Sequence, residues 1–215
     1  MKVGVFDSGV GGQSVAQAIA RAIPELDIEL REDKGNLPYG NKSPEELLRL
    51  TTPIFTEMVE AGCSVIVVAC NTVTTTIISE LRKVITVPLI GMEPMVKPAA
   101  EMTKSNVIAV CATPATLASG RYSWLKQTYA AQTNVLEPDC SDWAFMIETN
   151  QVDRTKIIDR IESVLAEGVD VIVLGCTHYH WIEQEIKDIC QDRATVLQPE
   201  GPVIAELTRV LAQLS

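Results

Sequence analysis

The chain has 215 residues, of which 47% are hydrophobic, 21% charged and 5% aromatic. This composition is typical of a folded globular protein and excludes disordered and fibrous architectures. Acidic residues outnumber basic ones by 28 to 18, and the net charge of −10 opposes a nucleic-acid partner. An acid stands at position 7, and no stretch approaches the roughly 18 apolar residues of a membrane span. We therefore expect a cytoplasmic protein with no membrane partner.

Short β-rich runs alternate with longer segments of helical periodicity along the whole chain. Several runs are apolar at successive positions, which is typical of buried parallel strands. The predicted strands are 2–6, 27–31, 65–69, 87–90, 106–110, 133–136, 171–175 and 195–197. The predicted helices are 12–23, 44–61, 72–84, 116–129, 155–167, 182–190 and 203–214. Ser43 and Glu46 form a capping box, and Pro24 ends the first helix. This order predicts an α/β fold with parallel sheets.

An internal repeat divides the chain into two halves. Residues 62–70 (GCSVIVVAC) align without gaps with residues 168–176 (GVDVIVLGC), and five of the nine positions are identical. Apolar strands match easily by chance, so the shared terminal cysteine carries the argument. We predict one α/β half from residues 1–92 with 200–215 and a second from residues 93–199, the last helix packing back on the first half.

Four polar or thiol side chains follow predicted strands, where parallel sheets bind their ligands: Asp7, Cys70, Thr113 and Cys176. If the halves face each other, the two cysteines flank one cleft. Two acid/base groups on opposite sides of a carbon suit racemisation or epimerisation. A thiol with a pKa near 8.5 needs assistance at neutral pH, from Asp7 for Cys70 and from His178 for Cys176. The alternative interpretation is that strand-end cysteines are small buried hydrophobic residues.

Other motifs leave alternatives open. Residues 7–12 (DSGVGG) follow a strand and open a helix, which fits a phosphate loop or only a tight turn. Cys176, His178 and His180 resemble zinc ligands, but helical periodicity resumes at once, so we expect no metal and place His180 at the surface. The six cysteines include no CxxC pair, which favours reduced thiols. Residues 38–40 predict a turn, and Glu148 is either a solvated helix end or a group held in the cleft.

Six segments together resemble the glutamate racemase family, within the cofactor-independent aspartate/glutamate racemase superfamily. They are residues 6–12 (FDSGVGG), 37–40 (LPYG), 69–72 (ACNT), 91–98 (GMEPMVKP), 112–116 (ATPAT) and 175–179 (GCTHY). The resemblance covers nearly the whole chain in the family's order. It implies two pseudo-symmetric α/β domains with the active site in the cleft between them, and two cysteines working without pyridoxal phosphate or metal. It also implies a homodimer that supplies D-glutamate for peptidoglycan.

The resemblance assigns roles to residues at matching positions. Cys70 would take the α-proton of D-glutamate and Cys176 that of L-glutamate, with Asp7 assisting Cys70 and with His178 and Glu148 assisting Cys176. The implied substrate-binding residues are Asp7, Ser8, Pro38, Tyr39, Gly40, Cys70, Asn71, Thr72, Thr113, Thr116, Cys176, Thr177 and His178. Lys97 is the only cation at the motif positions, so backbone N–H groups, hydroxyls and an amide would hold the carboxylates. This chain departs from the family at position 180, where His180 replaces the usual proline.

Two further functions stay open on the sequence alone. Aspartate and glutamate differ by one methylene, worth only ~1–3 kcal/mol of discrimination, so a racemase of aspartate or another acid is an alternative. A non-catalytic racemase-like binding protein is another. For the two-thiol arrangement, we expect the sulfur atoms roughly 7 Å apart on either side of one carbon, which is too far for a disulfide.

Overall fold

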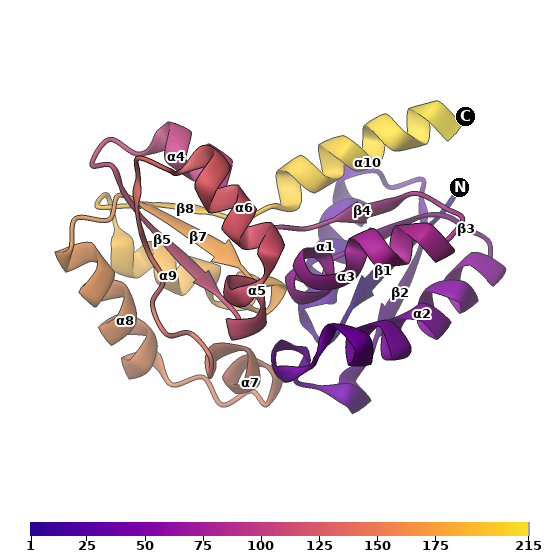
Figure 1. Cartoon of the computed structure of the whole chain (residues 1–215), viewed down its shortest axis with the longest axis horizontal. Helices are drawn as coiled ribbons and strands as arrows, with labels where there is room; N and C mark the ends of the chain where they lie inside the picture. Colours follow the sequence, from indigo (N-terminus) through magenta and orange to yellow (C-terminus); the bar gives the residue numbers. More distant parts are fainter. Residues whose placement is uncertain (215) are drawn as a thin grey trace. The chain divides into compact units, whose positions relative to one another are not determined.

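The chain forms two α/β units, each built on its own four-stranded parallel sheet (Figure 1). The structure, a computed structural model, describes residues 1–214. Unit 1 comprises residues 1–92 and 199–214, and unit 2 comprises residues 93–198. Among the described residues, no helix combines the length and apolarity required to cross a membrane.

The sheet of unit 1 is covered by helices on both faces. Its strands, in the order β2-β1-β3-β4, are β1 (Lys2–Asp7), β2 (Asp27–Glu32), β3 (Cys63–Val68) and β4 (Leu89–Gly91). One face packs against α1 (Gly11–Ala22) and α10 (Glu200–Leu214). The other packs against α2 (Pro44–Glu60) and α3 (Asn71–Val84). Two short 3₁₀ helices follow β2, namely η1 (Lys34–Asn36) and η2 (Tyr39–Asn41).

Alternation along β1 explains this three-layer arrangement. Val3 and Val5 are buried in the cluster with α1 and α10, whereas Phe6 is buried in the cluster with α2 and α3. Successive side chains of a strand point to opposite faces, so a strand that is apolar at neighbouring positions must be covered on both sides.

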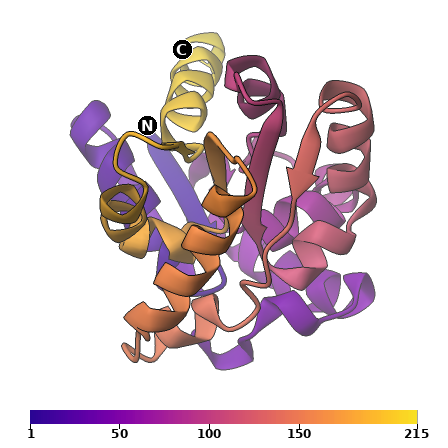
Figure 2. The ribbon, with the colours of Figure 1, turned by 90° about the vertical axis from the view of Figure 1, so that its left-hand side faces the viewer.

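Unit 2 repeats this strand order. Its strands, in the order β6-β5-β7-β8, are β5 (Val107–Ala112), β6 (Asn134–Leu136), β7 (Val171–Gly175) and β8 (Thr195–Leu197). Helices α4 (Val96–Met102) and α6 (Gly120–Tyr129) cover one face. The other face carries α7 (Trp143–Glu148), α8 (Arg154–Ala166) and α9 (Glu183–Cys190). Figure 2 shows these helices from the side of unit 2. The remaining elements are α5 (Pro114–Ala118) and the 3₁₀ helix η3 (Thr177–Ile182).

Two glycines of the sequence repeat have the same unusual backbone conformation. Gly62 precedes β3 with φ of +89°, and Gly168 comes shortly before β7 with φ of +85°. Side chains are disfavoured at such positive φ values, so a glycine is required at both turns. The repeated segment therefore has the same local structure in both units, from this turn to the strand that ends near the cysteine.

The α/β class with parallel sheets is confirmed, and all eight predicted strands are present. The capping residue Ser43 is also confirmed, because its side chain accepts from the N–H of Glu46. The predicted helix 116–129 is wrong in one respect, since it is two helices, α5 and α6. Ser119 lies between them in extended conformation, and its hydroxyl caps α6 by accepting from the N–H of Tyr122.

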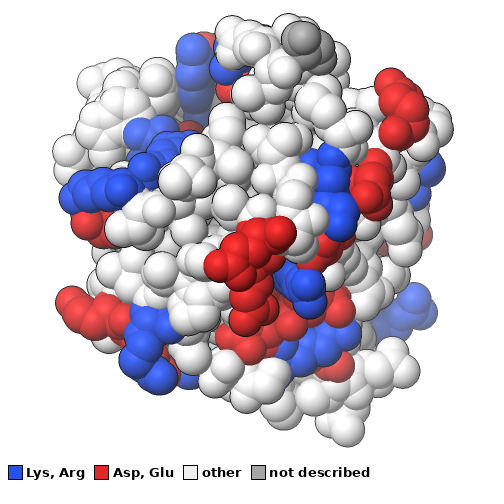
Figure 3. Space-filling model, turned by 90° about the vertical axis from the view of Figure 1, so that its right-hand side faces the viewer, with Lys and Arg blue, Asp and Glu red and all other residues white. Residues whose placement is uncertain are grey.

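Charged side chains of both signs are interspersed on the face of unit 1 that Figure 3 draws. Short-range pairs such as Lys83 with Glu80 and Arg209 with Glu206 recur along the exposed helices. Exposed pairs of this kind contribute roughly 0–1 kcal/mol each. They leave no large area of a single sign on this face.

Candidate active site

Each sheet has a switch point at its carboxyl edge. The helices that follow β1 and β3 lie on opposite faces of the first sheet, where open parallel sheets bind ligands. Asp7 ends β1, and Cys70 lies two residues beyond β3. In unit 2, Thr113 follows β5 and Cys176 follows β7. All four residues stand at strand ends, as predicted.

Cys70 is a buried thiol with a hydroxyl beside it. Its side chain is 4% exposed, and its Sγ lies 3.5 Å from Oγ of Ser8. Burial, reinforced by the negative charge of Asp7, raises the pKa of Cys70 to about 12. Hydrogen bonds from the Ser8 hydroxyl and from backbone N–H groups of Val73 and Ser8 oppose this rise. Cys70 is therefore a protonated thiol at neutral pH.

Asp7 is held at the end of β1 by the glycine-rich turn. The carboxyl group is fully buried, and its Oδ2 accepts from the N–H of Gly9 at 3.0 Å. A Cβ added at Gly12 would lie 2.6 Å from Cβ of Asp7, so only glycine lets α1 start this close. The tight turn between β1 and α1 is by itself a sufficient reason for the glycines of the DSGVGG segment.

Tyr39 in η2 is buried and donates its hydroxyl hydrogen to Oδ2 of Asp33 at 2.5 Å. Burial first, and then Asp33, raises the pKa of Tyr39, with further contributions from Cys70 and Asp7. The amide of Asn36 also donates to both carboxylate oxygens of Asp33, at 2.9 and 3.0 Å. The sequence reasoning missed Asp33, although it follows β2 as Asp7 ends the neighbouring strand β1.

The remaining candidates of unit 1 lie beside these groups in the chain. Pro38 and Gly40 flank Tyr39, and Pro38 is preceded by a cis peptide bond. Asn71 and Thr72 are buried in the first turn of α3. Nδ2 of Asn71 donates to the carbonyl of Met92 at 3.2 Å, while its Oδ1 is buried with no hydrogen-bond partner among residues 1–214. A buried acceptor without a donor costs free energy until a ligand supplies one.

In unit 2, His178 lies between Cys176 and Glu148. Nδ1 of His178 is 3.8 Å from Sγ of Cys176, and Nε2 is 2.8 Å from Oε2 of Glu148. An ionised carboxylate only accepts hydrogen bonds, so in the pair of an ionised Glu148 with a neutral imidazole Nε2 carries the hydrogen and the Nδ1 lone pair faces the thiol. The imidazole is thereby oriented to take a proton from sulfur. His180 lies in the same 3₁₀ helix and is half-buried, so it is less exposed than the surface position expected from the sequence.

The threonine candidates of unit 2 have different surroundings. Thr113 caps α5, accepting from the N–H of Thr116 at 3.3 Å and donating to its hydroxyl at 3.0 Å. Thr116 is fully buried, whereas Thr113 is half-buried, so Thr113 is the more accessible hydroxyl of the two. Thr177 is buried at the start of η3, next to Cys176.

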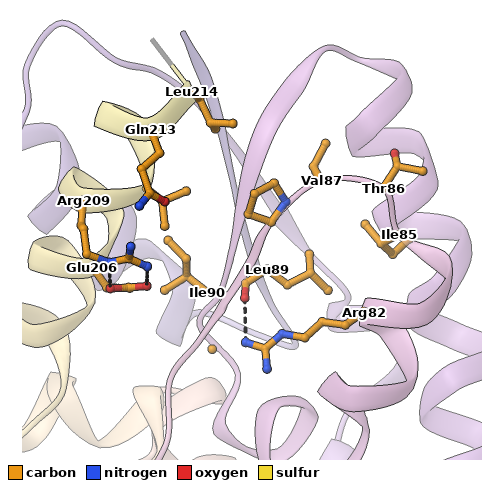
Figure 4. A pocket seen from close by; sticks show the side chains of 13 residues that line it. Arg82, Ile85, Thr86, Val87, Leu89, Ile90, Glu206, Arg209, Gln213 and Leu214 are labelled. Carbon is orange, nitrogen blue, oxygen red and sulfur yellow. Dashed lines mark hydrogen bonds and ion pairs between the residues drawn. The ribbon is translucent and has the colours of Figure 1, made fainter.

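The cysteines, the possible metal ligands and one surface pocket were compared with the candidate residues. None of the six cysteines forms a disulfide. Within residues 1–214, no group of three His, Cys, Asp or Glu side chains is placed to hold a metal ion. A surface pocket of about 650 Å³ lies between β4 and α10 (Figure 4). Its lining includes none of the candidate residues, and Arg82 donates there to the carbonyl of Leu89 at 2.8 Å.

Comparisons with known proteins agree with these observations. The sequence profile of a family described as Asp/Glu/Hydantoin racemase matches residues 9–200. The chain belongs to this racemase family. It is 36% identical to the glutamate racemase of Herpetosiphon aurantiacus, over 98% of this chain and 84% of the relative. It is 37% identical to the glutamate racemase of Stutzerimonas stutzeri, over 98% of this chain and 82% of that relative.

Solved structures of racemases share the fold. The Escherichia coli glutamate racemase, in complex with L-glutamate and an activator, UDP-MurNAc-Ala, matches with a TM-score of 0.86 at 25% identity. The match covers 98% of this chain and 82% of that one. Both units therefore belong to the racemase fold, and the resemblance inferred from the motifs is confirmed.

Proposed function

We propose that the protein interconverts L- and D-glutamate with two thiols, one working on each face of the α-carbon. The observation that carries the proposal is that Cys70 and Cys176 follow equivalent strands, β3 and β7, and that each thiol has polar neighbours: the Ser8 hydroxyl and the charge of Asp7 for Cys70, and the His178 imidazole for Cys176. The curated relatives, named glutamate racemases over nearly the whole chain, support glutamate as the substrate.

The reaction from L-glutamate starts at Cys176. Nδ1 of His178 accepts the thiol proton, and the resulting thiolate removes the α-proton of the substrate. Cys70 then gives its thiol proton to the opposite face of the carbanion, which yields D-glutamate. Glu148 stabilises the imidazolium through the hydrogen bond at Nε2. After this transfer Cys70 is a thiolate and His178 an imidazolium, so His178 releases one proton to solvent and Cys70 takes one up before the next turnover from L-glutamate. In the reverse reaction the two thiols exchange roles.

The high pKa of Cys70 suits its part in this sequence. A thiol with a pKa of about 12 holds its proton until a carbanion is there to receive it. For the reverse reaction the same thiol must lose the proton. The α-ammonium of a bound substrate brings a positive charge to the site, which lowers the pKa of a nearby thiol. Asp7 is the carboxylate available to take or steer that proton.

Substrate binding relies on neutral donors and acceptors. The largest influences on the pKa of Cys70 are burial, the charge of Asp7 and hydrogen bonds from Ser8 and Val73, and none of these comes from a lysine or arginine. The unpaired Oδ1 of Asn71 is suited to the α-ammonium group. Backbone N–H groups beside Ser8, Gly40 and Thr177, together with hydroxyl groups, are suited to the carboxylates.

Incubation with L-glutamate in D₂O, without added cofactor, tests the proposal. We expect loss of optical rotation together with deuterium at the α-carbon of the product. Folded protein that gives neither result would contradict the proposal. The same assay with L- and D-aspartate decides between glutamate and the shorter acid, because a site built for glutamate loses activity when one methylene is missing.

The biological role follows from the product. D-glutamate made in this way would supply peptidoglycan synthesis, and the homodimer and cytoplasmic location expected from the sequence remain predictions. A racemase-like binding protein is the competing function. If Cys70→Ala and Cys176→Ala left the biological effect unchanged, that alternative would replace catalysis.

A further inference from the structure

Helix α7 carries Glu148 and is too short to fix its own orientation. It runs from Trp143 to Glu148, six residues, which is less than two turns. Isolated helices of this length are not stable in water, so packing must hold α7 in place. Its Phe145 side chain is 64% exposed, so this part of the helix contributes little to packing.

The start of α7 is held by Tyr179 of η3. The Tyr179 ring packs edge-on against the Trp143 ring, with centroids 5.2 Å apart and planes at 69°. The Tyr179 hydroxyl donates to the carbonyl of Cys140, just before the helix, at 2.8 Å. All three residues are fully or almost fully buried. A hydrogen bond in such an apolar setting is directional and costly to break.

The end of α7 is held by the residue next to Tyr179. His178 pairs through Nε2 with Oε2 of Glu148 at 2.8 Å. Two consecutive residues of η3 thus contact opposite ends of one short helix. Lys156 and Arg160 also pair with the carboxylate of Asp142 just before the helix, but these ion pairs are partly exposed and contribute less.

We infer that Tyr179 is a positioning residue for the imidazole of His178, acting through α7 and Glu148. By fixing the start of α7, it sets where Glu148 meets Nε2, and thereby which nitrogen of His178 carries the hydrogen. The inference rests on the proposed function for its effect on rate. Its effect on the His178–Glu148 hydrogen bond is separate from catalysis and is measured separately.

Tyr179→Phe is the test variant, because it keeps the ring contact with Trp143 and removes only the hydrogen bond to Cys140. Tyr122→Phe is the matched control. Tyr122 is also fully buried in unit 2, and its hydroxyl donates to Oε1 of Glu137 at 2.9 Å, outside the candidate site. Both variants lose one buried tyrosine hydroxyl, so a difference between them is due to where the hydroxyl lies and not to the loss of a buried hydroxyl as such.

The first readout is NMR of ¹⁵N-histidine-labelled protein, which is simple to assign because the chain has two histidines. We expect the Nε2–H signal of His178 to move toward its position in Glu148→Gln, and its exchange with water to quicken roughly tenfold, in Tyr179→Phe. Tyr122→Phe should match the unmodified protein. If Tyr179→Phe also matches it while Glu148→Gln differs, the inference is overturned, whatever the activity.

The second readout is a double-mutant cycle on kcat/KM. We expect Tyr179→Phe to lower kcat/KM roughly tenfold alone, and less than about twofold in the Glu148→Gln background, because coupled residues are not additive. An equal loss in both backgrounds would show a merely structural role and overturn the inference.

If Tyr179→Phe does not fold, Trp143→Phe, which weakens the ring contact, is expected to shift the same Nε2–H signal. A protein that shows the NMR effect without racemase activity would refute the proposed function and leave the positioning role standing.

Discussion

The thiols of units 1 and 2 occupy equivalent places in their sheets but have different neighbours. Cys70 lies beside a hydroxyl and a buried carboxylate, and its pKa is raised to about 12. Cys176 lies beside an imidazole whose far nitrogen is bound by a carboxylate. One site thus favours a protonated thiol, and the other offers a base for its thiol. The duplicated fold supplies the two positions, and the local side chains make them chemically distinct.

Of the changes that test this difference between the two thiols, removing either thiol is expected to lower the rate of racemisation most. Cys70→Ala and Cys176→Ala should each lower kcat for racemisation by about 10³-fold or more, since each removes a group that transfers the α-proton. Cys63→Ala, which removes a buried thiol at the start of β3, serves as the control and should keep its activity. If racemase activity survived the loss of one of these thiols, that result would contradict the claim that both thiols transfer the α-proton.

Removing the partner of each thiol should separate the two faces of the reaction. His178→Asn and Asp7→Asn are each expected to lower kcat about 10²-fold. In His178→Asn the step at Cys176 becomes limiting, so the primary isotope effect should be larger with α-deuterated L-glutamate than with the D form. Asp7→Asn should give the opposite order. The same order in both variants would contradict the assignment of each thiol to one enantiomer.

The buried thiol of unit 1 predicts a loss of stability in alkali. The folded chain holds the Cys70 proton up to a pH of about 12, whereas the unfolded chain releases it near 8.5. Above about pH 8.5 the free energy of unfolding should therefore fall, with Cys70 contributing up to about 1.4 kcal/mol per pH unit. Urea unfolding at several alkaline pH values should show a shallower fall in Cys70→Ser. An unchanged slope would argue against a buried, protonated thiol.

The repeat also predicts a smaller effect, a difference in stability between two aligned residues that lie away from the candidate sites. Asp170 and Ser64 are aligned, and Asp170 accepts from the Thr103 hydroxyl and from the N–H groups of Lys104 and Ser105. Burial favours a higher pKa for Asp170, but these bonds outweigh it and lower the pKa. Among residues 1–214, the Ser64 side chain makes one hydrogen bond, from its hydroxyl to the carbonyl of Lys2 at 3.1 Å.

Asp170→Asn should therefore lower the free energy of unfolding by about 1–2 kcal/mol, and Ser64→Ala by about 0.5–1 kcal/mol. The contribution of Asp170 is present at neutral pH and is lost as the pH falls through its lowered folded-state pKa. Urea unfolding of both variants at neutral and acidic pH measures this. Equal losses at neutral pH would remove the predicted difference.

The sequence was informative where buried strands repeat and less so where tertiary packing decides. The run shared by residues 65–67 and 171–173 predicted β3 and β7, and with them the strand-end positions of Cys70 and Cys176. The breaks around Ser119 and the short helix α7 carry no comparable periodicity, because caps and contacts with η3 define them. For the same reason the hydrogen bond from Tyr179 to Cys140 emerges only once distant segments are packed. The hydrogen bonds of Asp33 are local, but they lie in the short 3₁₀ segments after β2, which have no periodic pattern.

Helix α10 is separated from the strands it covers by all of unit 2. Val203 and Leu207 of α10 lie in the same apolar cluster as Val3, Val5 and Val65. During translation this face of the first sheet is covered by α1 alone until α10 has left the ribosome, by which time every element of unit 2 has been synthesised. Unit 2 is therefore free to fold before unit 1 is complete. In the meantime a nascent chain exposes an apolar surface that a chaperone would protect from aggregation.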